Sequence, residues 1–123
     1  QAEPGMAANS HIRAVLKLFR TIDLDNSKKS FYLTAAKYGI QTQLREPLVR
    51  IVGGFLPSTK LSEACVKNAI AEIYGIEGEF YAKFSYACEN HEPYSVECLE
   101  DARDDYLTKL VELFKETKQC LRE

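Results

Sequence analysis

The sequence predicts an all-α protein: a small helical bundle dominated by a long antiparallel C-terminal helical hairpin, stapled by two disulfides, with shorter N-terminal helices packed on it. Apolar residues recur at helical spacing along most of the chain, two long apolar stripes flank Pro93, and all four cysteines lie in the two segments that carry those stripes. With 123 residues the chain is long enough for one core. We therefore expect a single domain, 1–123, whose residues 1–8 form a flexible N-terminal segment.

The N-terminal half predicts a first helix followed by a polar loop. Helically spaced apolar residues follow Asn9 and Ser10, either of which can cap a helix; they are Ile12, Val15, Leu16, Phe19 and Ile22. The loop is DLDNSKKS, residues 23–30.

Two shorter helices are expected next. Apolar residues over 31–38 predict a second helix that fades around Gly39. Because proline is tolerated in a first helical turn, Pro47 predicts a third helix that starts near Arg45 and ends at the glycine pair 53–54.

A longer helix is predicted over about 59–88, with Ser58 or Thr59 as its cap. Its apolar residues step by three or four without a change of phase: Leu61, Cys65, Ala69, Ile73, Ile76, Phe80, Phe84 and Ala87. Two interior glycines, Gly75 and Gly78, cost about 1 kcal/mol each against alanine, so a break there is the alternative.

The last helix is expected after the Pro93 turn, with Ser95 as its cap. Its stripe consists of Cys98, Ala102, Tyr106, Leu110, Leu113, Thr117 and Cys120.

The hairpin selects one of three cysteine pairings. Cys98 and Cys120 share a helix and would lie about 33 Å apart at 1.5 Å per residue, whereas a disulfide needs Cα atoms within about 7 Å. Facing residues of an antiparallel hairpin share one midpoint, and Pro93 is the midpoint, to within one residue, for both Cys88–Cys98 and Cys65–Cys120. We predict these two bridges, which suit an oxidising compartment.

The charge pattern is dipolar rather than basic. Residues 1–57 carry eight Lys and Arg against four Asp and Glu, and residues 58–123 carry eight against fourteen, in keeping with the net charge of −2. Nucleic-acid binding, which needs many cations for phosphate contacts, is disfavoured. No apolar run reaches the roughly 18 residues of a membrane span, so membrane insertion is not expected.

Two charged clusters are candidate partner-binding sites. Arg13, Lys17 and Arg20 share the face of the first helix opposite its apolar stripe. An acidic cluster occupies the first turns of the last helix: Glu97, Glu100, Asp101, Asp104 and Asp105. For the basic cluster the alternative is a solvated face, and for the acidic cluster it is stabilisation by the helix dipole.

Metal binding and catalysis are not expected. Cys88, His91, Glu92 and Cys98 follow no common zinc spacing, and both cysteines have predicted disulfide partners. The loop that starts at Asp23 lacks the glycine and the glutamate of a calcium loop. No nucleophile motif or phosphate-binding loop is recognisable, so we expect no enzyme and no cofactor.

The stretch PYSVECLEDARDDYL, residues 93–107, together with the four-cysteine framework, resembles the anophensin/albicin family of small secreted salivary proteins of anopheline mosquitoes. The resemblance is clearest over 61–121, and the cysteines correspond position by position. It implies an all-helical inhibitor, secreted in saliva, that binds a host plasma protein complex. Members have been associated with blocking the alternative complement pathway at its C3 convertase, and with blocking contact activation of the kallikrein–kinin system.

A carrier of small ligands, such as a biogenic amine or a lipid, is the remaining alternative. Insect odorant-binding and short salivary carriers typically have six cysteines, including a C-x3-C pair, and this chain has four cysteines without that pair. A monomeric inhibitor that acts by stoichiometric protein binding is therefore the preferred interpretation.

Overall fold

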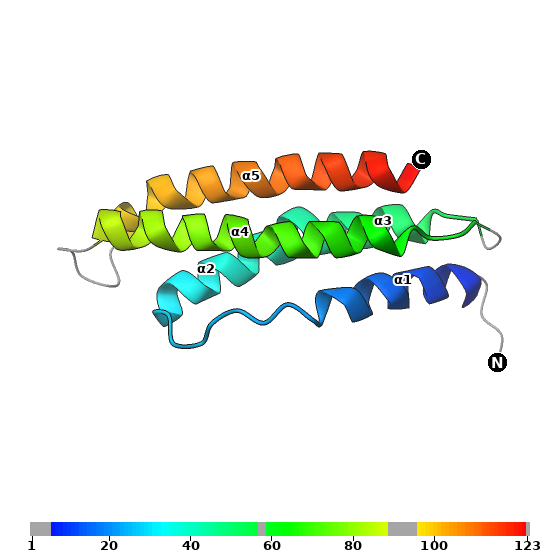
Figure 1. Cartoon of the computed structure of the whole chain (residues 1–123), viewed down its shortest axis with the longest axis horizontal. Coiled ribbons are helices and arrows are strands. Elements are labelled where there is room, and N and C mark those ends of the chain that lie inside the picture. Colours follow the sequence, from blue (N-terminus) through cyan, green and yellow to red (C-terminus); the bar gives the residue numbers. More distant parts are fainter. Residues whose placement is uncertain (1–5, 57–58, 89–95, 123) are drawn as a thin grey trace.

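Two long helices form the main body of the fold. In the computed structural model, which describes residues 6–56, 59–88 and 96–122, α4 (Glu63–Cys88) and α5 (Val96–Arg122) run antiparallel, side by side (Figure 1). Shorter helices pack on this hairpin, so the predicted all-α architecture is confirmed. The predicted Ser95 cap and the Pro93 turn lie outside the described residues.

α4 passes through Gly75 and Gly78 without a break, as the unchanged phase of the stripe predicted. The prediction that it begins near residue 59 is wrong, because it begins at Glu63. The N–H of Thr59 donates to the carbonyl oxygen of Leu56 (2.9 Å), so Thr59 precedes α4 and is not part of it. Ala87, assigned to the apolar stripe, is exposed.

Both predicted disulfides are present. The Cα atoms of Cys65 and Cys120 are 5.8 Å apart, and those of Cys88 and Cys98 are 5.2 Å apart. The hairpin is therefore cross-linked near both of its ends.

The second and third helices end and begin within about a residue of their predicted bounds, but the chain between them stays helical, which the sequence did not predict. α2 (Ser30–Ile40) continues into a π-helical segment, η1 (Gln41–Arg45), and then into α3 (Glu46–Gly53). A Cβ added to Gly39 would lie 2.6 Å from Cε2 of Tyr106, so glycine is used there for close packing on α5, not to end a helix.

The π-helical segment ends at Arg45, two residues before Pro47. A proline ring clashes with the carbonyl four residues earlier and has no N–H to donate. At the end of η1 the N–H of Glu46 donates to the carbonyl of Gln41, five residues earlier. This is the hydrogen bond of a π-helix, whose turn is wider than that of an α-helix and leaves room for the proline ring.

α1 (Met6–Phe19) begins before the predicted cap at Asn9 or Ser10. The two alanines after Met6 have the highest helix propensity of any residue, which favours this extension. Of the segment expected to be flexible over 1–8, residues 6–8 are part of α1, and residues 1–5 lie outside the described part. The helix also ends before Ile22, whose N–H donates to the carbonyl of Phe19 in a final turn (3.2 Å).

An aromatic cluster fills the core where α2, α4 and α5 meet. The ring of Phe80 stacks on that of Tyr106, with centroids 4.3 Å apart, and lies 4.7 Å from that of Tyr32. The hydroxyl of Tyr106 donates to the carbonyl of Ala36 (2.7 Å), which satisfies a buried polar group. Aromatic packing and a hydrogen bond therefore hold α2 against the hairpin.

Candidate functional site

The predicted basic cluster lies on the outer face of α1. Arg13, Lys17 and Arg20 are all exposed, because Val15 and Phe19 turn the opposite face of the helix into the core. Arg20 differs from the other two in also lining an open groove between α1 and the α2–η1–α3 segment.

This groove has a volume of about 400 Å³ and an apolar floor with a polar rim. Its apolar lining residues are Leu16, Phe19, Ile22, Leu24 and Ile40. Its charged lining residues are Arg20, Lys37, Arg45 and a single acid, Asp23.

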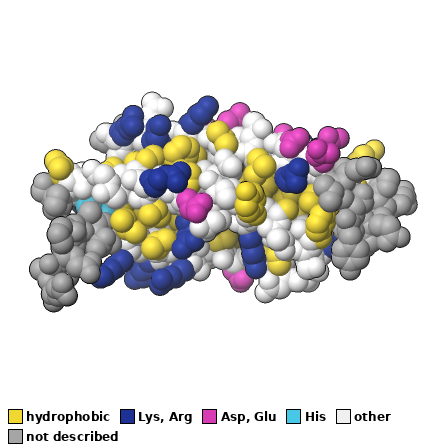
Figure 2. Space-filling view, turned by 180° about the vertical axis from the view of Figure 1, so that it is seen from behind, with side chains coloured by type: hydrophobic (Ala, Val, Ile, Leu, Met, Phe, Trp, Pro, Cys, Tyr) yellow, Lys and Arg dark blue, Asp and Glu magenta, His cyan; other side chains and the backbone are white. Residues whose placement is uncertain are grey.

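The groove continues past Arg45 into a second hollow of about 280 Å³. Leu16, Gln41 and Arg45 line both hollows, and Glu46, Val49 and Arg50 line the second one alone. Figure 2 shows Lys and Arg side chains gathered around hydrophobic ones over the α1 and α3 half of the molecule, while most Asp and Glu side chains on that face lie elsewhere. We call the two hollows together the basic groove.

Lys37, Gln41 and Arg45 follow one another at intervals of four residues, which places them on one helical face. Nη1 of Arg45 donates to Oε1 of Gln41 (2.5 Å), and both residues line the groove. Sequence reasoning missed Lys37 and Arg45 because it did not predict that η1 joins the second helix to the third. The four-residue spacing was the signal that could have identified them.

One wall of the groove is the loop between α1 and α2, which is held to α4 by hydrogen bonds. The hydroxyl of Tyr74 accepts from the N–H of Asp23 and donates to the carbonyl of Thr21, at 3.1 Å each. The carboxylate of Asp25 accepts from the N–H (2.9 Å) and the hydroxyl (2.7 Å) of Ser27, and these bonds lower the pKa of Asp25.

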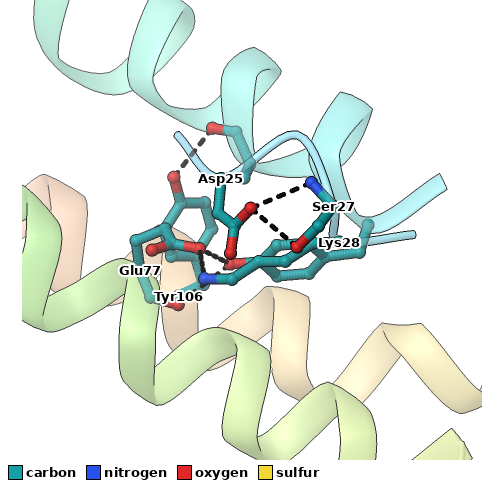
Figure 3. Close-up of polar contacts among 7 residues, drawn as sticks. Asp25, Ser27, Lys28, Glu77 and Tyr106 are labelled. Atoms are coloured by element: carbon teal, nitrogen blue, oxygen red, sulfur yellow. Dashed lines mark hydrogen bonds and ion pairs between the residues drawn. The ribbon is translucent and has the colours of Figure 1, made fainter. Parts of the chain in front are cut away.

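A buried ion pair completes the attachment of this loop (Figure 3). The ammonium of Lys28 lies 2.5 Å from Oε2 of Glu77, an α4 residue that is only 6 % exposed. The hydroxyl of Tyr32 donates to the same carboxylate oxygen. Burial, followed by the bond to Glu77, raises the pKa of Tyr32, which keeps the hydroxyl protonated as a donor. The groove wall is therefore attached to the hairpin through charge as well as packing.

The predicted acidic cluster is divided by the structure. Glu100, Asp101 and Asp104 are exposed, whereas Asp105 accepts from Lys83 of α4 (2.7 Å) and lies 3.4 Å from Lys109. The hydrogen bond from Lys83 is the main reason for the lowered pKa of Asp105.

Lys109 also pairs with Glu79, so Asp105 belongs to a set of contacts between α4 and α5. Glu97 lies on α5, and its side chain is outside the described part of the structure.

Within the described ranges, no group of three or more His, Cys, Asp and Glu residues is placed to hold a metal ion. Cys88 and Cys98, two of the four candidate ligands, are joined in a disulfide, and His91 and Glu92 lie outside the described residues. No described helix combines the length and the apolar character that crossing a membrane requires.

The fold and its surface define a small helical protein, cross-linked by disulfides, with an exposed groove of mixed apolar and basic character. The family model described as "Aegyptin, C-terminal domain" matches residues 6–121, and the chain belongs to this family. It is 84 % identical to a gSG7 salivary protein of Anopheles darlingi over 123 residues, which is 100 % of this chain and 87 % of the relative. A gSG7 salivary protein of Anopheles stephensi is 46 % identical over 98 % of this chain and 85 % of its own length.

Two solved structures are similar along nearly the whole chain. One is described as a mosquito complement inhibitor from Anopheles freeborni; it is 47 % identical, with a TM-score of 0.83 over 92 % of this chain and 95 % of that one. The other is an anophensin from Anopheles stephensi, 45 % identical, with a TM-score of 0.68 over 93 % and 97 % of the two chains. The resemblance drawn from the 93–107 stretch and the cysteine framework is confirmed.

Proposed function

We propose that this protein is a secreted salivary inhibitor of host complement that acts as a monomer, by stoichiometric binding, on the C3 convertase of the alternative pathway. The observation that carries the proposal is its similarity, at 47 % identity and a TM-score of 0.83, to the structure described as a mosquito complement inhibitor. The gSG7 relatives are salivary proteins, which supports secretion in saliva.

The surface is consistent with inhibition by binding. The basic groove has an apolar floor flanked by Arg and Lys side chains, a combination suited to contacts with another protein. The two disulfides hold the long hairpin in one shape, so less conformational entropy is lost when the surface docks.

A second candidate is inhibition of contact activation in the kallikrein–kinin system. The similarity to the anophensin of Anopheles stephensi favours this second candidate. The family resemblance seen in the sequence implies inhibition of contact activation as well as of complement. Both candidates require binding to a plasma protein complex.

A haemolysis assay of the alternative pathway, run beside a kallikrein-generation assay, tests the two candidates. We expect inhibition of haemolysis that saturates with concentration and leaves the chains of the target intact. Inhibition of kallikrein generation alone would move the function to the second candidate. Progressive cleavage of a complement protein at substoichiometric amounts would overturn the binding mechanism.

A further inference from the structure

We propose that the basic groove binds an acidic peptide segment of the inhibitor's protein target, with at least one apolar side chain of that segment seated on the groove floor. The inference rests on the proposed function and deepens it by assigning the contact surface and the chemistry of the partner.

The charges along the groove are available for a partner. Four cations line its two hollows, Arg20, Lys37, Arg45 and Arg50, against two acids, Asp23 and Glu46. In the part of the chain that the structure describes, none of these four cations forms an ion pair with the protein itself. By contrast, Lys28, Lys83 and Lys109 are all paired within the chain. The groove therefore keeps an excess of positive charge toward solvent.

The distribution of these charges selects a peptide over a small ligand. Lys37 and Arg50 are thirteen residues apart on nearly continuous helix, or about 20 Å at 1.5 Å per residue. The single carboxylate of a fatty acid cannot pair with cations that are spread over such a length. An extended peptide of about six residues spans the same distance and can carry several carboxylates. A cationic biogenic amine is disfavoured because the rim has the same sign of charge.

The floor supplies the apolar part of the contact. Phe19, Leu24 and Ile40 are buried, whereas Leu16 and Ile22 are only partly covered and keep accessible apolar surface in the groove. A Leu or Phe side chain seated there would add affinity by removing apolar surface from water. Apolar contact gives affinity and the cations on the rim give orientation and rate of association.

The test compares two charge-reversal variants with the same change in net charge. Lys37→Glu with Arg45→Glu alters the groove, and Arg13→Glu with Lys17→Glu alters the exposed face of α1 outside it. Binding to the assembled convertase is measured by surface plasmon resonance at two salt concentrations, beside haemolysis. Circular dichroism checks the fold, and Lys37→Gln with Arg45→Gln replaces the groove variant should the reversal fail to fold.

We expect the groove variant to lose about tenfold or more in affinity, and the α1 variant to lose less than about threefold. The association rate of the parent should fall with salt, because the Debye length shrinks from about 10 Å at 0.1 M to about 3 Å at 1 M. Equal binding by the groove variant and the parent would overturn the inference while leaving the proposed function intact. A parent that neither binds nor inhibits the convertase would instead overturn the proposed function. Tight calorimetric binding of oleate, lost in the groove variant while convertase binding persists, would assign the groove to a small ligand and also overturn the inference.

Discussion

The ammonium of Lys28 lies 2.5 Å from the carboxylate of Glu77, and this pair joins the loop after α1 to the middle of α4. The side chain of Glu77 is 8 % exposed and that of Lys28 is 16 % exposed, so both charges are largely removed from water. The ammonium also lies 4.7 Å from the ring centroid of Tyr81, a cation–π contact. Because the loop forms one wall of the basic groove, this pair links core stability to the shape of the candidate binding surface.

Lys28→Met is expected to destabilise the protein by about 2–4 kcal/mol, because it leaves the carboxylate of Glu77 buried without its counter-ion. The double variant Lys28→Met with Glu77→Leu should lower the free energy of unfolding by less than the two single changes added together, because it leaves no unpaired buried charge. Urea unfolding of the four proteins in this double-mutant cycle measures the coupling. Additive costs would show that the two charges do not interact.

The position of Glu77 could have been flagged from the sequence, but its partner could not. Glu77 lies four residues after Ile73 and three before Phe80, so it occupies a position on the apolar stripe of α4. A charge on such a face signals a buried partner. Lys28 is 49 residues away, in a loop whose path no periodicity specifies.

Periodicity predicted the hairpin and its disulfides because the buried faces of α4 and α5 repeat without interruption. It did not predict the helical segment η1 that joins α2 to α3, because local propensity at Gly39 indicates a break, whereas the glycine allows close contact with Tyr106. Without that segment, Lys37 and Arg45 were not placed on one helical face, and the basic groove was not predicted. Long-range packing, which decides where a helix crosses its neighbour, is the information that the local pattern lacks.

Replacing Gly39 by alanine should change the stability in the opposite direction from replacing Gly75 or Gly78. A Cβ at Gly39 would meet Tyr106 at 2.6 Å and Leu110 at 3.1 Å, so Gly39→Ala should destabilise by about 1–3 kcal/mol despite its better helix propensity. Gly75 and Gly78 have no atom within 4 Å of the added Cβ, so alanine at either position should stabilise α4 by about 0.5–1 kcal/mol.

Thermal unfolding of these three variants shows whether each substitution raises or lowers the stability of the protein. A stabilising Gly39→Ala would mean that α2 and α5 can move apart at no cost. A destabilising Gly75→Ala would mean that α4 needs the flexibility of glycine at that point.

The two disulfides should contribute unequally to stability. Cys88–Cys98 closes a sequence separation of 10 residues and Cys65–Cys120 one of 55. Chain-entropy estimates give about 3 and about 4 kcal/mol for the two bridges. Replacing each pair by alanine, which suits these mostly buried positions, should lower the midpoint of urea unfolding more for Cys65–Cys120. The reverse order would show that strain or residual structure outweighs loop length.

Alkaline pH should unfold the protein through its buried tyrosines. Tyr32 and Tyr106 are 0 % and 1 % exposed, and burial raises the pKa of both hydroxyls. In the unfolded chain tyrosine titrates near pH 10, so above this pH the unfolded state releases protons that the folded state retains. The stability that these two groups contribute is therefore complete below about pH 10 and is lost as the pH rises further. Between pH 10 and pH 11 the loss should be about 1 kcal/mol for each tyrosine.

Tyr106→Phe isolates one of the two groups. The variant loses the hydrogen bond to Ala36 and so starts from lower stability, but its stability should fall with pH less steeply than that of the parent above pH 10, because one of the two buried tyrosines no longer contributes. Urea unfolding at a series of alkaline pH values, with tyrosinate absorbance followed in parallel, measures both the slope and the state in which each hydroxyl ionises. An unchanged slope in Tyr106→Phe would mean that Tyr106 ionises in the folded protein, so that its burial does not set the alkaline limit.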